Sequence, residues 1–294
     1  MTTIFGVPTA ALFGQIMIGL INGSFYALLS LGLAVIFGML RVINFAHGAQ
    51  YMLGAFFAWM LLTWAGIGFW GALILAPLLV GLVAAALERL LIRRTYQLDH
   101  LYGLLLTFGL ALIIEGGFRH VFGSTGNSYP TPPALTGALN LGFMFLPTYR
   151  GFVILASLAV CVAVWFLIER TKLGSYLRAA TESPKLVQVF GINVPLLMTL
   201  TYALGAGLAG LAGVLAAPMY QVSPLMGQNM IIVVFAVVVI GGMGSILGAI
   251  ATGYILGLVE GLTRVFYPEA SATVIFLVMA IVLLIRPAGL FGRA

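Results

Sequence analysis

Charged side chains are scarce in this sequence. Asp, Glu, Lys and Arg make up 7% of the 294 residues, whereas about a quarter of a soluble domain is charged. Hydrophobic residues make up 62%, so the composition excludes a soluble globular protein and indicates an integral membrane protein. Because each crossing needs about 20 apolar residues, the chain has room for roughly eight to ten spans and no separate soluble domain. Any energy source would then have to be an ion gradient or a partner protein.

Cysteine and grouped catalytic side chains are also lacking. Cys161 is the only cysteine and lies in an apolar run, which excludes a disulfide or a thiolate metal site within one chain. His47, His100 and His120 lie on separate connections, and no nucleophile and base occur at a catalytic spacing. We therefore expect no enzyme activity and no metal or cofactor bound by this chain. A signal peptide with a basic start is not expected, because no Lys or Arg precedes Arg41.

Apolar runs separated by polar connections set the order of the predicted spans. The runs cover residues 11–40, 49–64, 71–92, 101–122, 151–168, 195–217, 230–240, 246–262 and 272–285. One crossing for each run places the N-terminus outside and the C-terminus inside. The basic residues predicted inside are Arg41, Arg89, Arg93, Arg94, Arg170, Lys172, Arg178, Lys185, Arg286 and Arg293; those outside are Arg119, Arg150 and Arg264. Lys and Arg concentrate in cytoplasmic connections, so this asymmetry supports the topology.

A polar stretch over residues 169–195 separates two of the long apolar runs. A simple turn would need only a handful of residues. Here Ser183 is placed as an N-cap, Pro184 as the first helical residue and Gly191 as the stop, with apolar residues at helical spacing up to Phe190. We predict a short amphipathic helix over 183–190, preceded by helix over 174–180. So short a helix is marginal alone, and docking to a soluble partner is favoured over adsorption to anionic lipid.

A polar patch from Asn44 to Gly48 follows the first run. An amide and an imidazole three residues apart, with no carboxylate nearby, indicate a helix break whose polar groups face a cavity or another helix. Asn44 and His47 are therefore candidates for lining the pathway or gate. The favoured alternative is structural: a cap at the cytoplasmic end in which Asn44 bonds the backbone and His47 lies at the interface.

A second patch, Gly241-Gly242-Met243-Gly244-Ser245, interrupts the apolar sequence near the C-terminus. Its three glycines and the serine are candidate gate residues as well. Close helix packing is the favoured explanation, because small residues let helices approach in lipid. A phosphate-binding loop is disfavoured, since no Lys or Thr follows.

Interrupted helices are suggested in two further ways. The uncharged run 11–40 is long for one tilted helix, which suggests a break or an interfacial lead-in near Asn22-Gly23. Residues 23–56 and 227–256 also look alike, each being an apolar run broken by a glycine-containing patch. Transporters often contain such repeats, but similar composition explains this particular likeness better.

Four ionisable residues lie close to the predicted outer ends of two spans. Glu115 and Arg119, and likewise Glu260 and Arg264, are spaced four apart, so each pair is expected to bond along its helix. A proton relay would need such groups deeper in the membrane, and structural pairing is favoured over function.

Five stretches taken together resemble a known family. They read GSFYALLSLGLAVIFGMLRVINFAHGA, GSYLRAATESPKLVQVFGINV, ALGAGLAGLAGVLAAP, VIGGMGSILGAIATG and LLIRPAGLFG. In this order they span nearly the whole chain and resemble the branched-chain amino acid ABC-transporter permeases of the LivH type. The resemblance implies an all-α polytopic fold of the type II importer class with inverted repeats. It also implies one permease domain over 1–294, with a coupling loop at about 170–193 and a periplasmic loop at about 123–150.

In such permeases a loop carrying Gly-x-x-x-Arg-Ala and a later Gly sits in a groove of the ATPase. Together with the helix pattern, this gives the predicted ATPase-coupling set: Gly174, Arg178, Ala179, Ser183, Pro184, Phe190 and Gly191. The resemblance implies a permease of the bacterial inner membrane that has no ATPase activity. The implied partners are a second related permease, two subunits that bind ATP and Mg²⁺, and a periplasmic or lipid-anchored binding protein.

The implied solutes are leucine, isoleucine and valine, which suit a pathway with few charges. The same machinery could instead carry short amides, urea or another amino acid. A more remote alternative is a proton- or sodium-coupled secondary transporter, which needs a titratable group near the membrane midplane that the predicted spans do not supply. A passive channel is disfavoured by the long, ordered polar loop.

Overall fold

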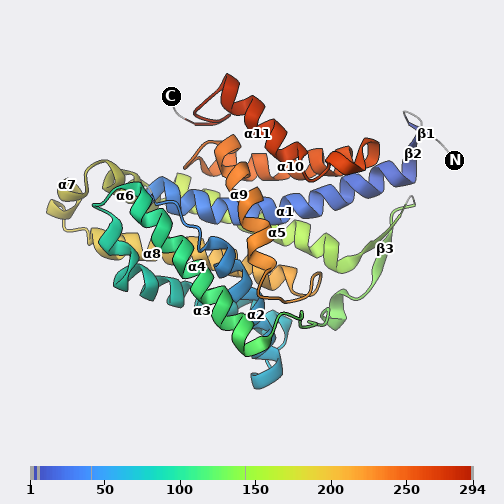
Figure 1. The fold of residues 1–294 in the computed structure, drawn as a ribbon, viewed down its shortest axis with the longest axis horizontal. Coiled ribbons are helices and arrows are strands. Elements are labelled where there is room, and N and C mark those ends of the chain that lie inside the picture. The colour runs from blue at the N-terminus through green and yellow to red at the C-terminus, as the bar shows by residue number, and fades with distance from the viewer. Residues whose placement is uncertain (1–2, 5–6, 41, 143, 293–294) are drawn as a thin grey trace.

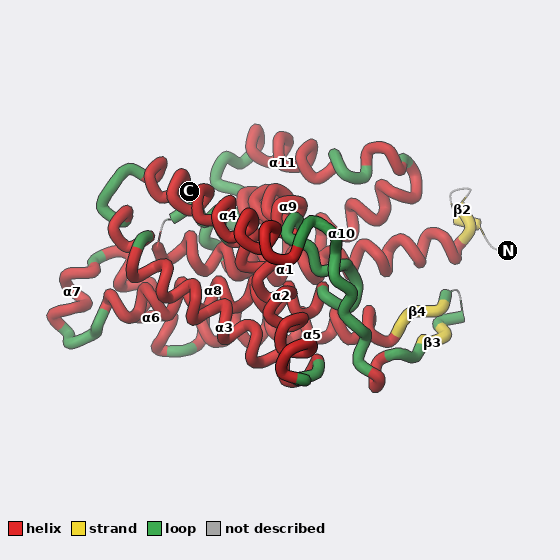
Figure 2. Tube along the Cα trace, turned by 60° about the horizontal axis from the view of Figure 1, so that its bottom comes forward, coloured by secondary structure: helices red, strands yellow, loops and turns green. Residues whose placement is uncertain are grey.

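The computed structural model describes residues 3–4, 7–40, 42–142 and 144–292; Arg41 and Arg293, both predicted inside, lie outside these ranges. A bundle of helices with two short hairpins fills the described part (Figures 1 and 2). Its helices are α1 (Thr9–Leu40), α2 (His47–Ala65), α3 (Phe69–Leu90), α4 (His100–Phe122), α5 (Thr148–Arg170), α6 (Lys172–Glu182), α7 (Pro184–Val189), α8 (Val194–Ala216), α9 (Met226–Gly241), α10 (Ile246–Phe266) and α11 (Val274–Ile285). The hairpins pair β1 (Thr3–Ile4) with β2 (Val7–Pro8), and β3 (Ala138–Asn140) with β4 (Phe145–Pro147); short 3₁₀ turns η1, η2 and η3 cover Ile92–Thr95, Pro133–Leu135 and Pro268–Ala270.

Each predicted apolar run forms a helix. Among the described residues, six helices are long and apolar enough to cross a membrane: α1, α3, α4, α5, α8 and α10. The apolar helices α9 and α11 are shorter, and α2 has 19 residues with a polar start. The chain is therefore a multi-pass, largely helical membrane protein, as its composition predicts.

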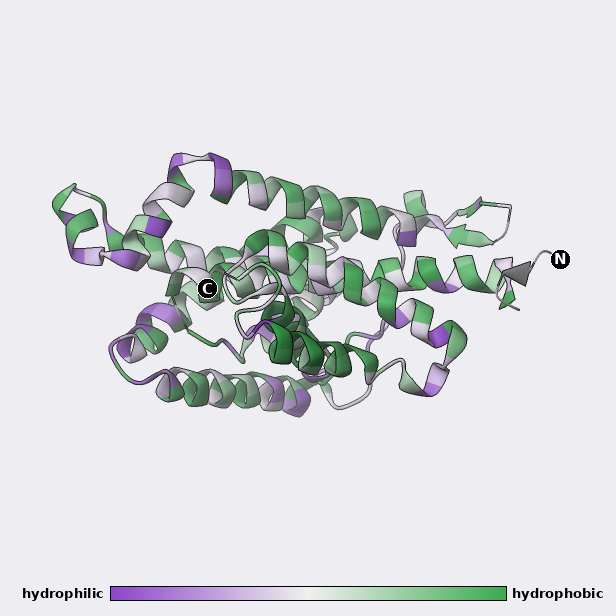
Figure 3. Cartoon of the chain, turned by 90° about the horizontal axis from the view of Figure 1, so that it is seen from above, coloured by the Kyte–Doolittle hydropathy of each residue, from purple (hydrophilic) through white to green (hydrophobic). Residues whose placement is uncertain are grey.

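The two ends of the bundle differ. Helices α6 and α7 lie at one end, and the C-terminus lies on that side; the N-terminus and both hairpins lie at the other end (Figure 1). Hydrophobic residues dominate along the length of the helices, and hydrophilic residues gather toward the ends (Figure 3). Termini on opposite sides fit an odd number of crossings. We refer to the end with α6 and α7 as the predicted cytoplasmic end.

Local capping explains where several helices begin and end. Asp99 accepts a hydrogen bond from the Leu101 backbone N–H at 2.9 Å and so starts α4. Asn193 starts α8 in the same way. Gly66 ends α2 in the left-handed conformation, with φ of 65°, which a residue with a side chain adopts at a cost.

The contacts between helices show an inverted repeat. α1 packs along α10, and α3 packs along α8. Gly32 of α1 and Gly205 of α8 cross so closely that a Cβ on either would meet the other's carbonyl oxygen at 2.6 Å. Gly48 near the start of α2 and Gly227 near the start of α9 meet in the same reciprocal way. The unit α1–α2–α3 therefore corresponds to α8–α9–α10, with α1 and α8 running in opposite directions.

This correspondence agrees with one prediction. Matching residues 23–56 with 227–256 would pair α1 with α9, whereas the packing pairs α1 with α8, so that likeness reflects composition, as favoured, and the repeat has a different alignment. The break suggested at Asn22-Gly23 is corrected: it is absent, because α1 is a continuous helix of 32 residues. Gly23 instead lies against the backbone of Tyr254 in α10, and Asn22 Nδ2 lies 3.4 Å from Glu260 Oε1. The small and polar residues there serve packing against α10.

Candidate functional site

The predicted coupling segment forms two helices, α6 and α7. The helix expected over 174–180 is confirmed, and it extends over all 11 residues of α6. A small hydrophobic cluster, which we call the coupling cluster, joins this segment to the start of α8: it comprises Leu177, Ala180, Val187, Val194 and Leu197. The coupling cluster holds both short helices against a membrane span.

A tight elbow joins α6 to α5. Gly174 is buried, and a Cβ at this position would overlap the carbonyl oxygen of Ile168. Arg178 Nη1 donates to that same oxygen at 3.2 Å and to Glu169 Oε2 at 3.3 Å. A cation beside the last carbonyls of a helix interacts favourably with the helix dipole. Arg178 therefore fastens α6 to the end of α5 within this chain, while neighbouring Ala179 faces solvent.

Helix α7 presents an apolar face to solvent. Leu186, Val189 and Phe190 are 62%, 81% and 82% exposed, whereas Val187 of the same helix is buried in the coupling cluster. Exposed apolar residues are unremarkable where lipid covers them, but here they lie on the polar connection beyond the spans. We call these three residues the α7 tip.

The ends of α7 follow the sequence prediction with one exception. Pro184 is the first helical residue, and Gly191 follows the helix with φ of 79°. Ser183 stands at the N-cap position, but its side chain makes no capping hydrogen bond, so this part of the prediction is wrong. Its backbone carbonyl accepts from the Val187 N–H at 3.2 Å instead.

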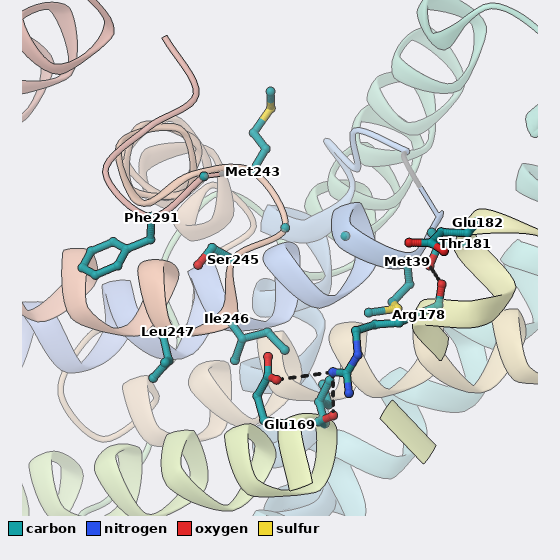
Figure 4. A pocket seen from close by; sticks show the side chains of 14 residues that line it. Met39, Glu169, Arg178, Thr181, Glu182, Met243, Ser245, Ile246, Leu247 and Phe291 are labelled. Carbon is teal, nitrogen blue, oxygen red and sulfur yellow. Dashed lines mark hydrogen bonds and ion pairs between the residues drawn. The ribbon is translucent and has the colours of Figure 1, made fainter. Parts of the chain in front are cut away.

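A cleft of about 520 Å³ opens beside α6 at the predicted cytoplasmic end (Figure 4). It is lined by Gly38 and Met39 of α1, Ile168 and Glu169 of α5, Arg178, Thr181 and Glu182 of α6, residues 243–247 from the α9–α10 connection and α10, and Phe291 and Gly292 of the tail. We call it the cytoplasmic cleft. It brings Arg178 of the predicted coupling set together with Gly244 and Ser245 of the predicted gate set, which sequence reasoning treated separately.

The glycine patch between α9 and α10 packs closely, as favoured from the sequence. Gly241 lies against Gly248 of α10, and Gly242, with φ of 98°, lies against Gly289 of the C-terminal tail. The tail also caps α9: the Leu290 N–H donates to the Ile240 carbonyl at 2.8 Å. Ser245 caps α10 by accepting from the Gly248 N–H at 3.1 Å. A gating role for this patch stays a prediction.

The polar patch from Asn44 to Gly48 is more deeply buried than expected for a cap at the cytoplasmic end, which was the favoured alternative. Asn44 does bond the backbone, accepting from the Ala46 N–H at 3.1 Å. His47, however, is fully buried, and its Nε2 donates to the Leu29 carbonyl at 2.9 Å, about 16 Å before the end of α1. An interfacial position for His47 is therefore wrong. Gln50 extends the network, because it accepts from Asn44 and donates to Tyr202, each at 3.2 Å.

Of the two ion pairs predicted near the outer ends of the spans, one forms and the other does not. Arg264 bonds Glu260 at 2.7 Å along α10, as expected, and the Tyr26 hydroxyl donates to Glu260 at the same distance. Glu115 accepts instead from Gln228 of α9, and the described structure records no ion pair between Glu115 and Arg119. Helix geometry permits an i, i+4 pair, but Gln228 of α9 offers Glu115 a partner from another helix.

A buried cluster around Glu88 was missed by the sequence analysis. Arg93 Nε donates to Glu88 Oε1 at 3.1 Å, and the Tyr96 hydroxyl donates to it at 2.9 Å. Thr199 of α8 donates to Oε2 at 2.7 Å, so the cluster fastens the C-terminal end of α3 to the start of α8. Burial, and then the Glu88 carboxylate, raise the pKa of Tyr96 above its ordinary value. The only sequence signal was Glu88 and Arg93 lying either side of a helix end.

Comparison with known proteins identifies several similar sequences. Residues 15–284 match the family described as "Branched-chain amino acid transport system / permease component". The high-affinity branched-chain amino acid transport system permease protein LivH of Escherichia coli (strain K12) is 30% identical over 295 residues, 95% of either chain. The corresponding LivM of that organism is 28% identical, over 90% of this chain and 67% of LivM. A solved structure, PsaBC from Streptococcus pneumoniae in complex with Fab, has 16% identity and a TM-score of 0.41 over 94% of this chain and 88% of that one.

Proposed function

The chain belongs to the branched-chain amino acid permease family, and on this premise we propose that it is the membrane-spanning subunit of an ATP-driven importer of leucine, isoleucine and valine. In this proposal the chain binds no ATP or other cofactor and catalyses no reaction. Separate subunits bind and hydrolyse ATP with Mg²⁺, and a periplasmic or lipid-anchored binding protein delivers the solute from outside. The bacterial inner membrane is the proposed location.

The observation that carries this proposal is the α7 tip. Leu186, Val189 and Phe190 form an exposed apolar face beyond the membrane spans, where water would otherwise cover it. Apolar area of this kind is favourable when it fits a groove of another protein. A helix-in-groove contact with an ATP-binding subunit matches the position, the size and the chemistry of this face.

The attachments behind the α7 tip supply a route for movement. The elbow at Gly174 and the Arg178 bonds connect α6 to α5, and the coupling cluster connects α6 and α7 to α8. When ATP draws the two nucleotide-binding subunits together, displacement of α7 is transmitted to these two spans. The closely packed helices then move as rigid units, giving alternating access.

Solute selection in this proposal belongs mainly to the binding protein. The buried carboxylates Glu88, Glu115 and Glu260 are each hydrogen-bonded within the chain, which supports a pathway that does not hold solutes by fixed charge. The same observation disfavours coupling to a proton or sodium gradient. Apolar solutes such as leucine fit such a pathway, whereas urea and short amides would be better held by unpaired polar groups.

A second permease is proposed as the direct partner within the membrane. The similarity of this chain to both LivH and LivM of a single organism supports pairing between two related permeases. We propose a heterodimer of this chain with a LivM-like chain, flanked by two ATP-binding subunits.

The test is uptake of labelled leucine into proteoliposomes that contain the permease pair, the ATP-binding subunits and the binding protein. We expect uptake to require ATP and the binding protein, and to be inhibited by unlabelled isoleucine and valine but not by urea or acetamide. Uptake that persists without the ATP-binding subunits would contradict the proposal and favour an ion-coupled transporter. Inhibition by urea or acetamide alone would retain the machinery but reject the proposed solutes.

A further inference from the structure

We infer that the cytoplasmic cleft binds a free amino acid with an apolar side chain, and that this binding slows import when the transported product accumulates inside. The inference rests on the proposed function, because it takes the product of import as the ligand. The cleft lies at the end where that product would be released, and its lining matches the three chemical parts of such a molecule.

The charged lining fits a zwitterion. Both recorded bonds of Arg178 use Nη1, so Nε and Nη2 can still donate to a carboxylate. Glu169 uses only Oε2, which leaves Oε1 to accept from an ammonium group. Within the described residues no hydrogen bond or ion pair engages the Glu182 carboxylate, which also lines the cleft. A cation and two carboxylates in one cleft complement a carboxylate and an ammonium group on the same ligand.

The opposite wall of the cleft is apolar. Ile246, Leu247 and Phe291 line it, and Figure 4 shows them on the side away from Thr181 and Glu182, whereas Met39 lies beside Arg178. A volume of about 520 Å³ lies within the range of small-molecule sites. An aliphatic side chain can rest on this wall while the charged end of the same molecule reaches Arg178 and Glu182. Among the described residues of this wall, no cation is present to pair with the charged side chain of glutamate.

The position of the cleft links occupancy to transport. One wall is α6, which moves with the α7 tip in the proposed mechanism, and the other is the α9–α10 connection together with the tail that caps α9. A ligand that contacts both walls stabilises the conformation in which α6 and the α9–α10 connection are as far apart as in this structure. Because a ligand shifts an equilibrium by its differential affinity for the two states, occupancy opposes the movement of α6.

Direct binding is tested by cysteine labelling of the assembled transporter in detergent. Leu247→Cys places a thiol at a position that is 53% exposed in the cleft, while the natural Cys161 is buried. We expect leucine to slow maleimide labelling of this thiol several-fold, whereas leucinamide, which lacks the carboxylate, and isocaproate, which lacks the ammonium group, do not. Adding Glu182→Gln should abolish the protection. A Glu269→Cys variant, on the distant η3 turn, should label at one rate throughout.

Feedback is tested in proteoliposomes that carry the transporter and are preloaded with leucine or left empty. Preloading should reduce the initial rate of labelled leucine uptake about fivefold for the unaltered chain and leave the Glu182→Gln rate nearly unchanged. The matched control Glu269→Gln removes one acidic charge far from the cleft and should retain the inhibition. Empty vesicles carrying any of these chains should take up leucine equally well.

The results separate the two proposals. Failure of uptake into empty vesicles rejects the proposed function, whatever the labelling shows. Normal uptake with no protection of the Leu247→Cys thiol overturns the cleft inference alone. A thiol that is blocked in the assembled complex without leucine shows that a partner fills the cleft, which also overturns it. Equal inhibition of the unaltered and Glu182→Gln chains would place the inhibitory site elsewhere.

Discussion

Helices α6 and α7 are neighbours in sequence but have opposite surroundings. α6 is fastened within the chain by the Gly174 elbow, by Arg178 and by the coupling cluster, whereas α7 keeps one residue, Val187, in that cluster and exposes the rest of its apolar face. The two halves of the coupling segment therefore have different tasks. In the proposed function, α6 transmits displacement into the spans, and α7 provides the surface that receives it. Substitutions in α6 should therefore impair folding or transport, whereas substitutions in α7 should weaken binding of the ATP-binding subunits.

The largest effect is expected at the elbow. Gly174→Val places side-chain atoms on the Ile168 carbonyl, and forced overpacking of this kind costs about 1–3 kcal/mol. We expect a lower thermal unfolding temperature and little assembled complex, measured by fluorescence-detected size exclusion of the purified permease. Gly109→Val, on α4 where a Cβ would meet no neighbour within 4 Å, is the matched control and should leave both unchanged. An unaltered unfolding temperature for Gly174→Val would show that α6 is not held as described.

The next largest effect is expected for Arg178→Glu. The substitution replaces a cation at the end of α5 by an anion beside Glu169, so α6 loses its attachment to α5. We expect uptake and substrate-stimulated ATP hydrolysis to fall about tenfold, while the ATP-binding subunits remain bound. Arg178→Lys keeps the charge and should restore part of the activity. Loss of the bound subunits instead would mean that Arg178 contacts the partner directly.

A smaller and different effect is expected at the α7 tip. Phe190→Ser removes an aromatic ring that is 82% exposed, so the permease should fold normally and bind the ATP-binding subunits about tenfold more weakly. Co-purification at graded salt and protein concentration measures this affinity. Phe145→Ser, at a ring that is 70% exposed on the β4 strand at the opposite end, is the control. Equal affinities for both variants would exclude α7 as the docking helix.

The smallest effect is expected for Ser183→Ala. A residue that caps a helix with its side chain typically contributes about 1 kcal/mol, but Ser183 caps α7 only through its backbone carbonyl. We expect a change below about 0.5 kcal/mol in unfolding free energy and normal uptake. Asn193→Ala, which removes a side-chain cap at the start of α8, should cost more. A larger loss for Ser183→Ala than for Asn193→Ala would mean that the serine hydroxyl acts on a partner.

Local sequence patterns were sufficient to predict where helices begin and end. They were less successful in predicting which side chains bond to one another. Pro184 and Gly191 bound α7 as predicted, because proline and glycine act through their own backbone. Ser183 occupies the N-cap position, as predicted, but makes no capping bond with its side chain. Glu115 failed to pair with Arg119 because α9 brings Gln228 within reach. The Glu115 failure concerns a side chain that bonds a distant residue in place of a local one.

The amino-acid sequence alone determined that this is a multi-pass helical membrane protein, where its apolar helices lie and where its polar segment interrupts them. Scarce charge, apolar run length and the distribution of Lys and Arg carry that information locally. Only the tertiary structure decided that α1 pairs with α8 in the inverted repeat, that Arg178 bonds the end of α5, and that α6, the α9–α10 connection and the tail enclose one cleft. The pairing of α1 with α8 and the lining of the cleft join residues far apart in the chain, and at Gly32 and Gly205 the pairing depends on a close approach of two helix backbones.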